Sequence, residues 1–117
     1  MKPTMIRAAL AGAALFSATL TASAAEMLTD ANGMTLYVFD KDTDGKPSCY
    51  DDCAAKWPPY LGKEGDAMAK DWGLVDRTDG TKQWTYDGKP IYFFAGDKAK
   101  GDMAGDGMGG FWHIIKE

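Results

Sequence analysis

The sequence has a single histidine and contains none of the short motifs that mark common hydrolytic sites. It has no G-x-S-x-G nucleophile elbow and no zinc-binding H-E-x-x-H segment. Its carboxylates are numerous, but they lie in segments predicted as loops, where nothing would raise a carboxyl pKa. We therefore expect a protein that is not an enzyme, and we assign no catalytic residues.

Clusters of basic residues and long apolar stretches are also missing. The chain has 13 basic and 17 acidic residues, which gives a net charge of −4. A chain of this charge, without a basic patch, has no electrostatic footprint for nucleic acid. Beyond the N-terminal leader, no apolar segment reaches the roughly 20 residues that span a bilayer. We expect no nucleic-acid partner and no membrane anchor in the mature chain, and the sequence identifies no specific partner.

Residues 1–25 have the features of a secretory signal peptide. Two basic residues precede an apolar run over Ala8–Leu20, and Ala22–Ala24 has the small-residue pattern of a cleavage site. Cleavage leaves one predicted domain, residues 26–117, with a net charge of −6 because the leader carries two basic residues and no acidic ones. A lipid-anchored lipoprotein needs a cysteine directly after its cleavage site. Both cysteines lie far from it, so we expect a soluble periplasmic or secreted protein.

A ten-residue pattern occurs twice in the chain, 55 residues apart. Both copies, Gly33–Asp42 and Gly88–Asp97, read G-x-x-[LI]-Y-x-F-x-x-D. The duplication predicts two repeats in one domain, at about 26–60 and 72–117. Along an extended strand, both faces of each copy are apolar, which favours central strands covered on two sides. The motif residues are Tyr37, Phe39, Asp42, Tyr92, Phe94 and Asp97. We interpret their rings as core, with a ligand-stacking platform as the alternative.

Turn signals divide the rest of the mature chain into short strands. The dipeptides Asp79-Gly80 and Asp87-Gly88 are typical of hairpins. A short helix is predicted over residues 50–56 with Ser48 as its N-cap, and residues 62–70 read as a polar connection. The main predicted strands span residues 35–39, 72–76, 82–86, 89–94 and 111–115. The predicted fold class is mainly β, a small antiparallel meander built from two repeats, with one short helix around the C-x-x-x-C segment.

The order of the motifs resembles a bacterial family of secreted repeats, also described as predicted lipoproteins with a Yx(F/W/Y)xxD motif. Besides the twin motif, the resemblance rests on two segments. Ser48–Pro59 reads S-x-x-x-x-C-A-x-x-W-P-P, and Gly101–Trp112 reads G-D-x-x-G-D-G-x-G-G-x-W. The resemblance implies an exported, duplicated small domain. The family is described as of unknown function, so it implies no activity.

The two cysteines, Cys49 and Cys53, have two open interpretations. Paired cysteines in an exported protein are oxidised by default, which predicts a structural disulfide worth about 2 kcal/mol. Alternatively, the thiols form a redox pair or, together with His113, a copper site, since thiolates suit Cu(I) and imidazole suits both copper states. The first interpretation predicts a binding or structural module with no cofactor, and the second a periplasmic copper-binding or thiol redox protein.

The segment Asp40-Lys-Asp-Thr-Asp-Gly45 matches the start of an EF-hand calcium loop. Asp40, Asp42 and Asp44 alternate as ligands do in such loops, and Asp51 stands at the twelfth position. That position normally holds a glutamate, and Pro47 stands where an apolar strand residue belongs. A weak calcium site and a solvated acidic turn both remain open.

A glycine-rich loop follows the second copy of the motif. Residues 96–110 include Met103 and Met108, whose thioethers are soft metal ligands. We interpret the segment as a surface loop, with a ligand-binding loop as the alternative. It lacks the residue order of a phosphate-binding loop.

Overall fold

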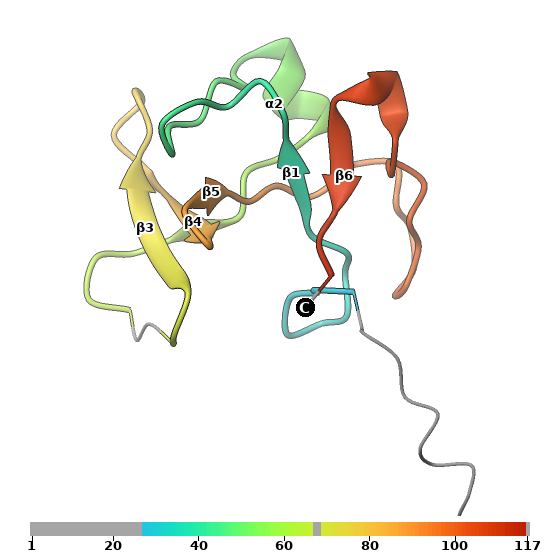
Figure 1. Cartoon of the computed structure of the whole chain (residues 1–117), viewed down its shortest axis with the longest axis horizontal. Helices are drawn as coiled ribbons and strands as arrows, with labels where there is room; N and C mark the ends of the chain where they lie inside the picture. The colour runs from blue at the N-terminus through green and yellow to red at the C-terminus, as the bar shows by residue number, and fades with distance from the viewer. Residues whose placement is uncertain (1–26, 67–68, 117) are drawn as a thin grey trace, which may run out of the picture.

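The computed structural model describes residues 27–66 and 69–116 (Figure 1). The predicted signal peptide lies outside these residues. The elements are β1 (Tyr37–Phe39), α2 (Asp52–Lys56), β2 (Leu61–Gly62), β3 (Trp72–Asp76), β4 (Lys82–Tyr86), β5 (Lys89–Pro90), the 3₁₀ turn η1 (Met108–Gly110) and β6 (Trp112–Ile114). The paired strands are antiparallel, and α2 lies at the cysteine segment. The predicted fold class is confirmed.

The strands form two small sheets that lie side by side (Figure 1). In the first, β1 pairs with β6. In the second, β4 is central, with β3 along one edge and with β2 and β5 at opposite ends of the other edge. The turn between β4 and β5 uses Asp87 and Gly88, whose φ angles of 54° and 80° suit the predicted type I′ hairpin. Over the described residues, no helix has the length and apolar character needed to cross a membrane.

The two copies of the repeated pattern run antiparallel beside each other. Tyr37 and Tyr92 form the bridge between them. The N–H group of Tyr37 donates to the carbonyl of Tyr92 at 2.8 Å, and the reciprocal bond measures 2.9 Å. Tyr37 and Tyr92 occupy the same position of the motif, so the two copies contact each other at equivalent residues.

Each copy also has an equivalent extended segment on its outer side. β6 flanks the first copy, where the N–H group of Asp40 donates to the carbonyl of Phe111 at 2.8 Å. Residues 56–60 flank the second copy, where the N–H group of Ala95 donates to the carbonyl of Lys56, also at 2.8 Å. Asp40 and Ala95 occupy the same motif position, so the duplicated sequence folds with approximate twofold symmetry.

Two hydrophobic clusters enclose the repeat strands. The first contains Tyr37, Cys49, Trp57, Tyr92 and Trp112, and the second contains Leu28, Leu36 and Ile91. The tyrosine and the preceding aliphatic residue of each copy have no exposed surface. Both faces of these strands are covered, as their apolar faces predicted.

The start of the helix differs from the prediction. α2 begins at Asp52, not near Tyr50, and no side chain caps it. Ser48 is not the N-cap. Its backbone N–H group and its hydroxyl both donate to the carboxylate of Asp42, at 2.8 and 2.7 Å. Ser48 pairs with the Asp42 carboxylate because this one partner accepts hydrogen bonds from both its N–H group and its hydroxyl. A position at the helix cap would not satisfy both groups.

Two strands also differ from their predicted extent. Leu61–Gly62 lies at the edge of the predicted polar connection, but it pairs with β4 as β2. The predicted strand over 89–94 is reduced to β5 at Lys89–Pro90 and an isolated bridge at Tyr92. Pairing partners decide both cases, because a short segment becomes a strand only where a neighbouring edge has free backbone groups.

Candidate functional site

The tyrosine and aspartate of the repeated motif pair across the two copies. Tyr37 donates its hydroxyl to the carboxylate of Asp97 at 2.7 Å, and Tyr92 donates to that of Asp42 at 2.9 Å. Asp97 also accepts the N–H group of Ala104 at 2.9 Å. These crossed pairs hold the two repeats together.

Burial sets the ionisation of these groups. Desolvation raises the pKa of Tyr37, and the hydrogen bond to Asp97 raises it further. Desolvation also raises the pKa of Tyr92, with the charge of Asp42 adding to the effect. The pKa of Asp42 is raised by burial, and hydrogen bonds from Ser48 and Tyr92 offset part of that rise. The hydroxyls stay protonated at neutral pH and act as hydrogen-bond donors.

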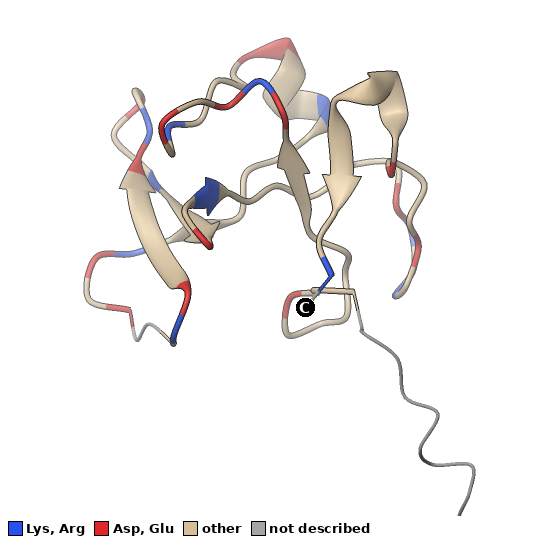
Figure 2. Cartoon of the chain, in the orientation of Figure 1, with Lys and Arg blue, Asp and Glu red and all other residues tan. Residues whose placement is uncertain are grey.

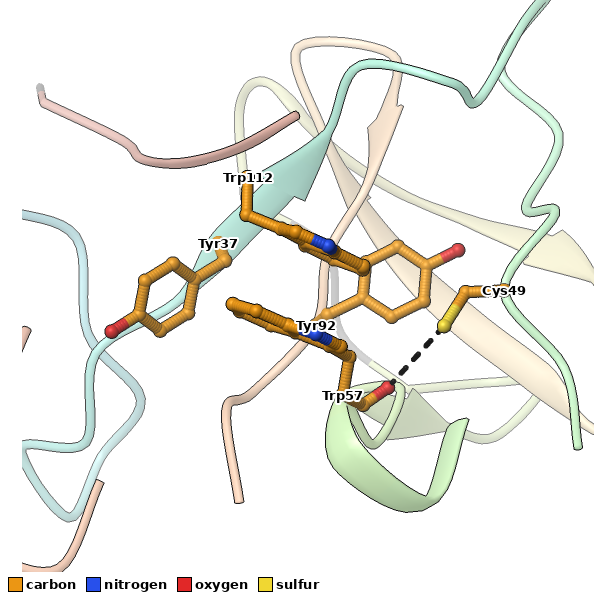
Figure 3. Close-up of a cluster of buried hydrophobic side chains, with 5 residues drawn as sticks. All are labelled: Tyr37, Cys49, Trp57, Tyr92 and Trp112. Carbon is orange, nitrogen blue, oxygen red and sulfur yellow. Dashed lines mark hydrogen bonds between the residues drawn. The ribbon is translucent and has the colours of Figure 1, made fainter. Parts of the chain in front are cut away.

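The aromatic rings of the two copies form a closed stack (Figure 3). Trp57 and Trp112 stack face to face, with ring centroids 3.8 Å apart and an interplanar angle of 1°. Phe39 stacks on Trp112 at 4.0 Å, and Phe94 packs on Trp57 at 4.3 Å. The rings occupy one another's faces, so we interpret them as core and not as a ligand-stacking platform.

Cys49 and Cys53 form a disulfide beside this stack, with Cα atoms 5.2 Å apart. Cys49 has no exposed surface, and its sulfur lies 3.9 Å from the carbonyl oxygen of Trp57 (Figure 3). Asp51, between the cysteines, has a φ of 53°, so the bridge joins a helical residue to one outside the helix. Residues four apart on a regular helix have Cβ atoms about 5–6 Å apart, which is too far for a disulfide. The break in the helix at Asp51 removes this obstacle.

His113 pairs with Asp40 at the surface, with 2.8 Å between Nε2 and Oδ2. In residues 27–66 and 69–116, no three His, Cys, Asp or Glu side chains form a group suited to a metal ion. The predicted copper set of Cys49, Cys53 and His113 is not brought together as such a group. Copper binding stays a prediction.

The carboxylates of the acidic turn have separate partners. Asp40 faces His113, whereas Asp42 accepts hydrogen bonds from Ser48 and Tyr92. A cavity of about 260 Å³ beside the turn is lined by both carboxylates and also by Lys89. The geometry shows no convergence with Asp44 and Asp51, and calcium binding at these four residues stays a prediction.

The glycine-rich loop is held by hydrogen bonds from its backbone to one of its own carboxylates. Asp102 accepts the N–H groups of Lys98 and Ala99 at 2.8 and 2.9 Å. Met103 and Met108 are 50% and 44% exposed. The loop therefore has an internally bonded backbone and presents its methionines to solvent.

β4 buries two polar side chains and leaves its two aromatic ones half-buried. Gln83 and Thr85 are 0% and 8% exposed, whereas Trp84 and Tyr86 keep part of their surface in contact with solvent. Tyr86 lies opposite Trp72 of β3 in the strand register, so Trp72 shares this outer face. Trp72 and Tyr86 also pack against the second hydrophobic cluster, so this aromatic face is partly buried and only partly open to solvent.

A buried polar network makes this orientation possible. Arg77 donates to the amide oxygen of Gln83 at 2.7 Å and to the carbonyl of Cys49 at 2.9 Å. Gln83 donates its own N–H group to the carbonyl of Ile91 at 2.8 Å. The guanidinium of Arg77 also stacks over Tyr50 at 4.2 Å. Because the inward amide is satisfied on both its atoms, it costs little to bury.

A pocket of about 210 Å³ lies on the outer aromatic face, lined by Tyr60, Ala69, Trp72 and Trp84. The ring of Trp72 is perpendicular to those of Trp84 and Tyr60, at 89° in both cases, with centroids 5.7 and 6.3 Å apart. Gly62 leaves room for Trp84, since a Cβ there would lie 2.8 Å from the indole Nε1. We call this site the aromatic pocket.

The aromatic pocket has no aromatic counterpart at the symmetry-equivalent place in the fold. The N–H group of Trp84 donates to the carbonyl of Tyr60 at 2.8 Å, as that of Leu28 donates to Ile115 in the other copy, also at 2.8 Å. At these equivalent positions one copy has two aromatic residues and the other has two aliphatic ones. Leu28 is 5% exposed. The two repeats share a core and differ at the pocket.

A family described as a secreted repeat of unknown function matches the chain twice, over residues 18–60 and 73–116. The two matches together cover well over half of the sequence. The chain belongs to this secreted-repeat family. No curated protein and no solved structure matches it.

The aromatic pocket lies where the two secreted-repeat matches meet. Tyr60 is the last residue of the first match, and Trp84 lies in the second. Ala69 and Trp72 fall between them. Sequence reasoning missed this site because the alternation along Lys82–Tyr86 identifies two faces without showing which one is buried.

Proposed function

We propose that this protein is an exported, non-catalytic binding module whose ligand site is the aromatic pocket. Export is supported by membership in a secreted-repeat family and by the signal-peptide features of residues 1–25. Both support a mature protein that acts in the periplasm or outside the cell.

The observation that carries the proposal is the orientation of β4. Burying an indole contributes more hydrophobic stabilisation than burying an amide, even one with satisfied hydrogen bonds. The fold nevertheless buries Gln83 and leaves Trp84 half-buried. A bound ligand would cover the exposed part of the indole and recover that stabilisation.

Binding is favoured over catalysis by the chemistry of the lining. Among the described residues that line the aromatic pocket, none has a carboxylate, imidazole, thiol or amine. The one titratable group, the Tyr60 hydroxyl, has its pKa raised by burial and by the charge of Asp30. A protonated phenol in an apolar site fits recognition and lacks the base that proton transfer requires.

A ligand-observed NMR screen of the mature protein tests the proposal. Separate mixtures would contain sugars, neutral aromatics, organic anions and organic cations. The proposal predicts at least one class whose binding is lost in Trp84→Leu and kept in Phe111→Leu, a matched change at an aromatic residue that is 41% exposed elsewhere. Binding that survives Trp84→Leu, or no binding in any class, would overturn it.

A further inference from the structure

The walls of the aromatic pocket form corners. Trp72 meets Trp84 and Tyr60 at right angles, with their rings in contact. A flat pyranose or aromatic ring can stack on only one of two perpendicular planes. A rounded group can touch both, because its surface curves in the same way as the corner. The geometry therefore favours a compact, roughly spherical ligand group.

Among the described residues of the lining, the side-chain polar atoms are few. Tyr60 contributes a phenol, and Trp72 and Trp84 each contribute an indole N–H, which only donates. A sugar or a primary amine in this pocket would leave most of its hydrogen-bonding groups unpaired, at a considerable cost. A fully methylated ammonium has no N–H group to satisfy, and it is attracted to the faces of aromatic rings.

The charge around the pocket also suits a cation. The Asp30 carboxylate lies close enough to Tyr60 for its negative charge to raise the pKa of that phenol. In Figure 2, acidic segments lie on both sides of β3, interspersed with basic ones. The whole chain carries a net charge of −4. One carboxylate therefore acts on the phenol of the pocket, in a chain whose net charge is negative.

We propose, on the basis of the proposed function above, that the aromatic pocket binds a quaternary ammonium group. Its methyl groups would lie in the corners between Trp72, Trp84 and Tyr60, with the positive charge over the ring faces. Aromatic cages that recognise such groups combine apolar contact with cation–π attraction, and each ring contributes to both.

Isothermal titration of the mature protein with choline tests this inference. The reference ligand is the neutral isostere of choline, in which carbon replaces the quaternary nitrogen. Both ligands have the same shape, so only the cation–π and field contributions differ. We expect choline to bind about fivefold or more tightly than the isostere. Equal binding of the two, or tighter binding of the isostere, would overturn the inference.

Variants separate the contributions. Trp84→Leu should weaken choline binding about fivefold or more, and Trp84→Phe, which keeps an aromatic wall, should weaken it less. Asp30→Asn keeps an acceptor for the N–H groups of Asn32 and Met34, which Asp30 now binds at 2.9 Å. This variant should bind choline more weakly and bind the neutral isostere with unchanged affinity. Phe111→Leu should change the affinity for neither ligand. An effect as large as that of Trp84→Leu would contradict binding at the aromatic pocket.

The outcomes distinguish the inference from the proposed function. Trp84-dependent binding of a sugar or of the neutral isostere, without preference for choline, would end the quaternary ammonium assignment and keep the binding module. Co-sedimentation with phosphatidylcholine vesicles that choline displaces would identify a lipid headgroup as the source of the group. Choline binding without co-sedimentation would identify a free solute.

Discussion

At the residue scale, Gly105 shows how closely the aromatic core is packed. A Cβ at this position would lie 2.5 Å from the indole of Trp57 and 3.0 Å from the ring of Phe94. Both rings are fixed by the stack of the two repeats, so neither can move aside cheaply. The glycine is required here for space and not for its backbone angles.

Gly105→Ala should therefore destabilise the protein by about 1–3 kcal/mol, the usual cost of overpacking. Urea unfolding followed by tryptophan fluorescence would measure the change in the free energy of unfolding. Ala104→Ser, at the exposed neighbouring position, is the control and should change stability little. A Gly105→Ala variant as stable as the wild type would show that the stack is looser than described.

The motif tyrosines act as hydrogen-bond donors to buried carboxylates of the other repeat. Tyr92→Phe would leave Asp42, whose pKa is already raised by burial, with one donor fewer. We expect a loss of about 1–3 kcal/mol in the free energy of unfolding. Adding Asp42→Asn to Tyr92→Phe should cost less than the sum of the two single changes. Strict additivity in this double-mutant cycle would argue against the crossed pair.

These residues also show the limit of prediction from sequence. The motif itself, the faces of its strand and its place in the core follow from spacing and apolar alternation. The hydrogen bonds that join Tyr37 to Asp97 and Tyr92 to Asp42 cannot be predicted in this way. They form only because the two copies meet antiparallel at their tyrosines. Local spacing within one copy contains no information on that register.

At the scale of elements, the disulfide fastens α2 to the segment before it. Reducing it, or replacing both cysteines by alanine, should lower the free energy of unfolding by about 2 kcal/mol, the entropy of closing so short a loop. Urea unfolding with and without reductant would measure this. The tryptophan bands of the near-ultraviolet circular dichroism spectrum should be retained, because the stacking of Trp57 on Trp112 does not depend on the bridge. Loss of those bands on reduction would contradict this account.

The β4 strand marks the clearest divergence between pattern and structure. Its boundaries were predicted correctly as residues 82–86, but its sequence presents Trp84 and Tyr86 on one face and Gln83 and Thr85 on the other. Hydrophobicity alone favours burying the aromatic face. The reverse holds because Arg77, in the turn that joins β3 to β4, donates a hydrogen bond to the inward Gln83, and the alternation along the strand does not indicate that contact.

At the scale of the whole molecule, the raised pKa values of the two motif tyrosines link folding to alkaline pH. In the unfolded chain tyrosine ionises near pH 10, whereas folded Tyr37 and Tyr92 hold their protons to higher pH. The folded state then binds more protons, so stability is fully present below about pH 10 and is lost as pH rises above it.

The expected slope is a loss of about 1.4 kcal/mol per pH unit for each of the two tyrosines. Urea unfolding at several values between about pH 9 and about pH 11 would give this slope. Tyr37→Phe, although less stable at neutral pH, should lose roughly half of the slope. An unfolding free energy that stays constant across this range would mean that the two hydroxyls are open to solvent.

The duplicated architecture places the tryptophans in two separate surroundings. Trp57 and Trp112 of the symmetric core face each other, while Trp72 and Trp84 line the pocket at the junction of the repeats. The four tryptophans of the sequence thus form two pairs in different surroundings. The core pair is an internal reference for the binding proposed at the aromatic pocket.

The most direct measurement is the indole N–H spectrum of the ¹⁵N-labelled mature protein during a titration with choline. The account predicts that the signals of Trp72 and Trp84, assigned from Trp72→Phe and Trp84→Phe, move with a common affinity while those of Trp57 and Trp112 stay in place. Four unmoved signals, or shifts confined to the core pair, would contradict the binding of choline at the aromatic pocket.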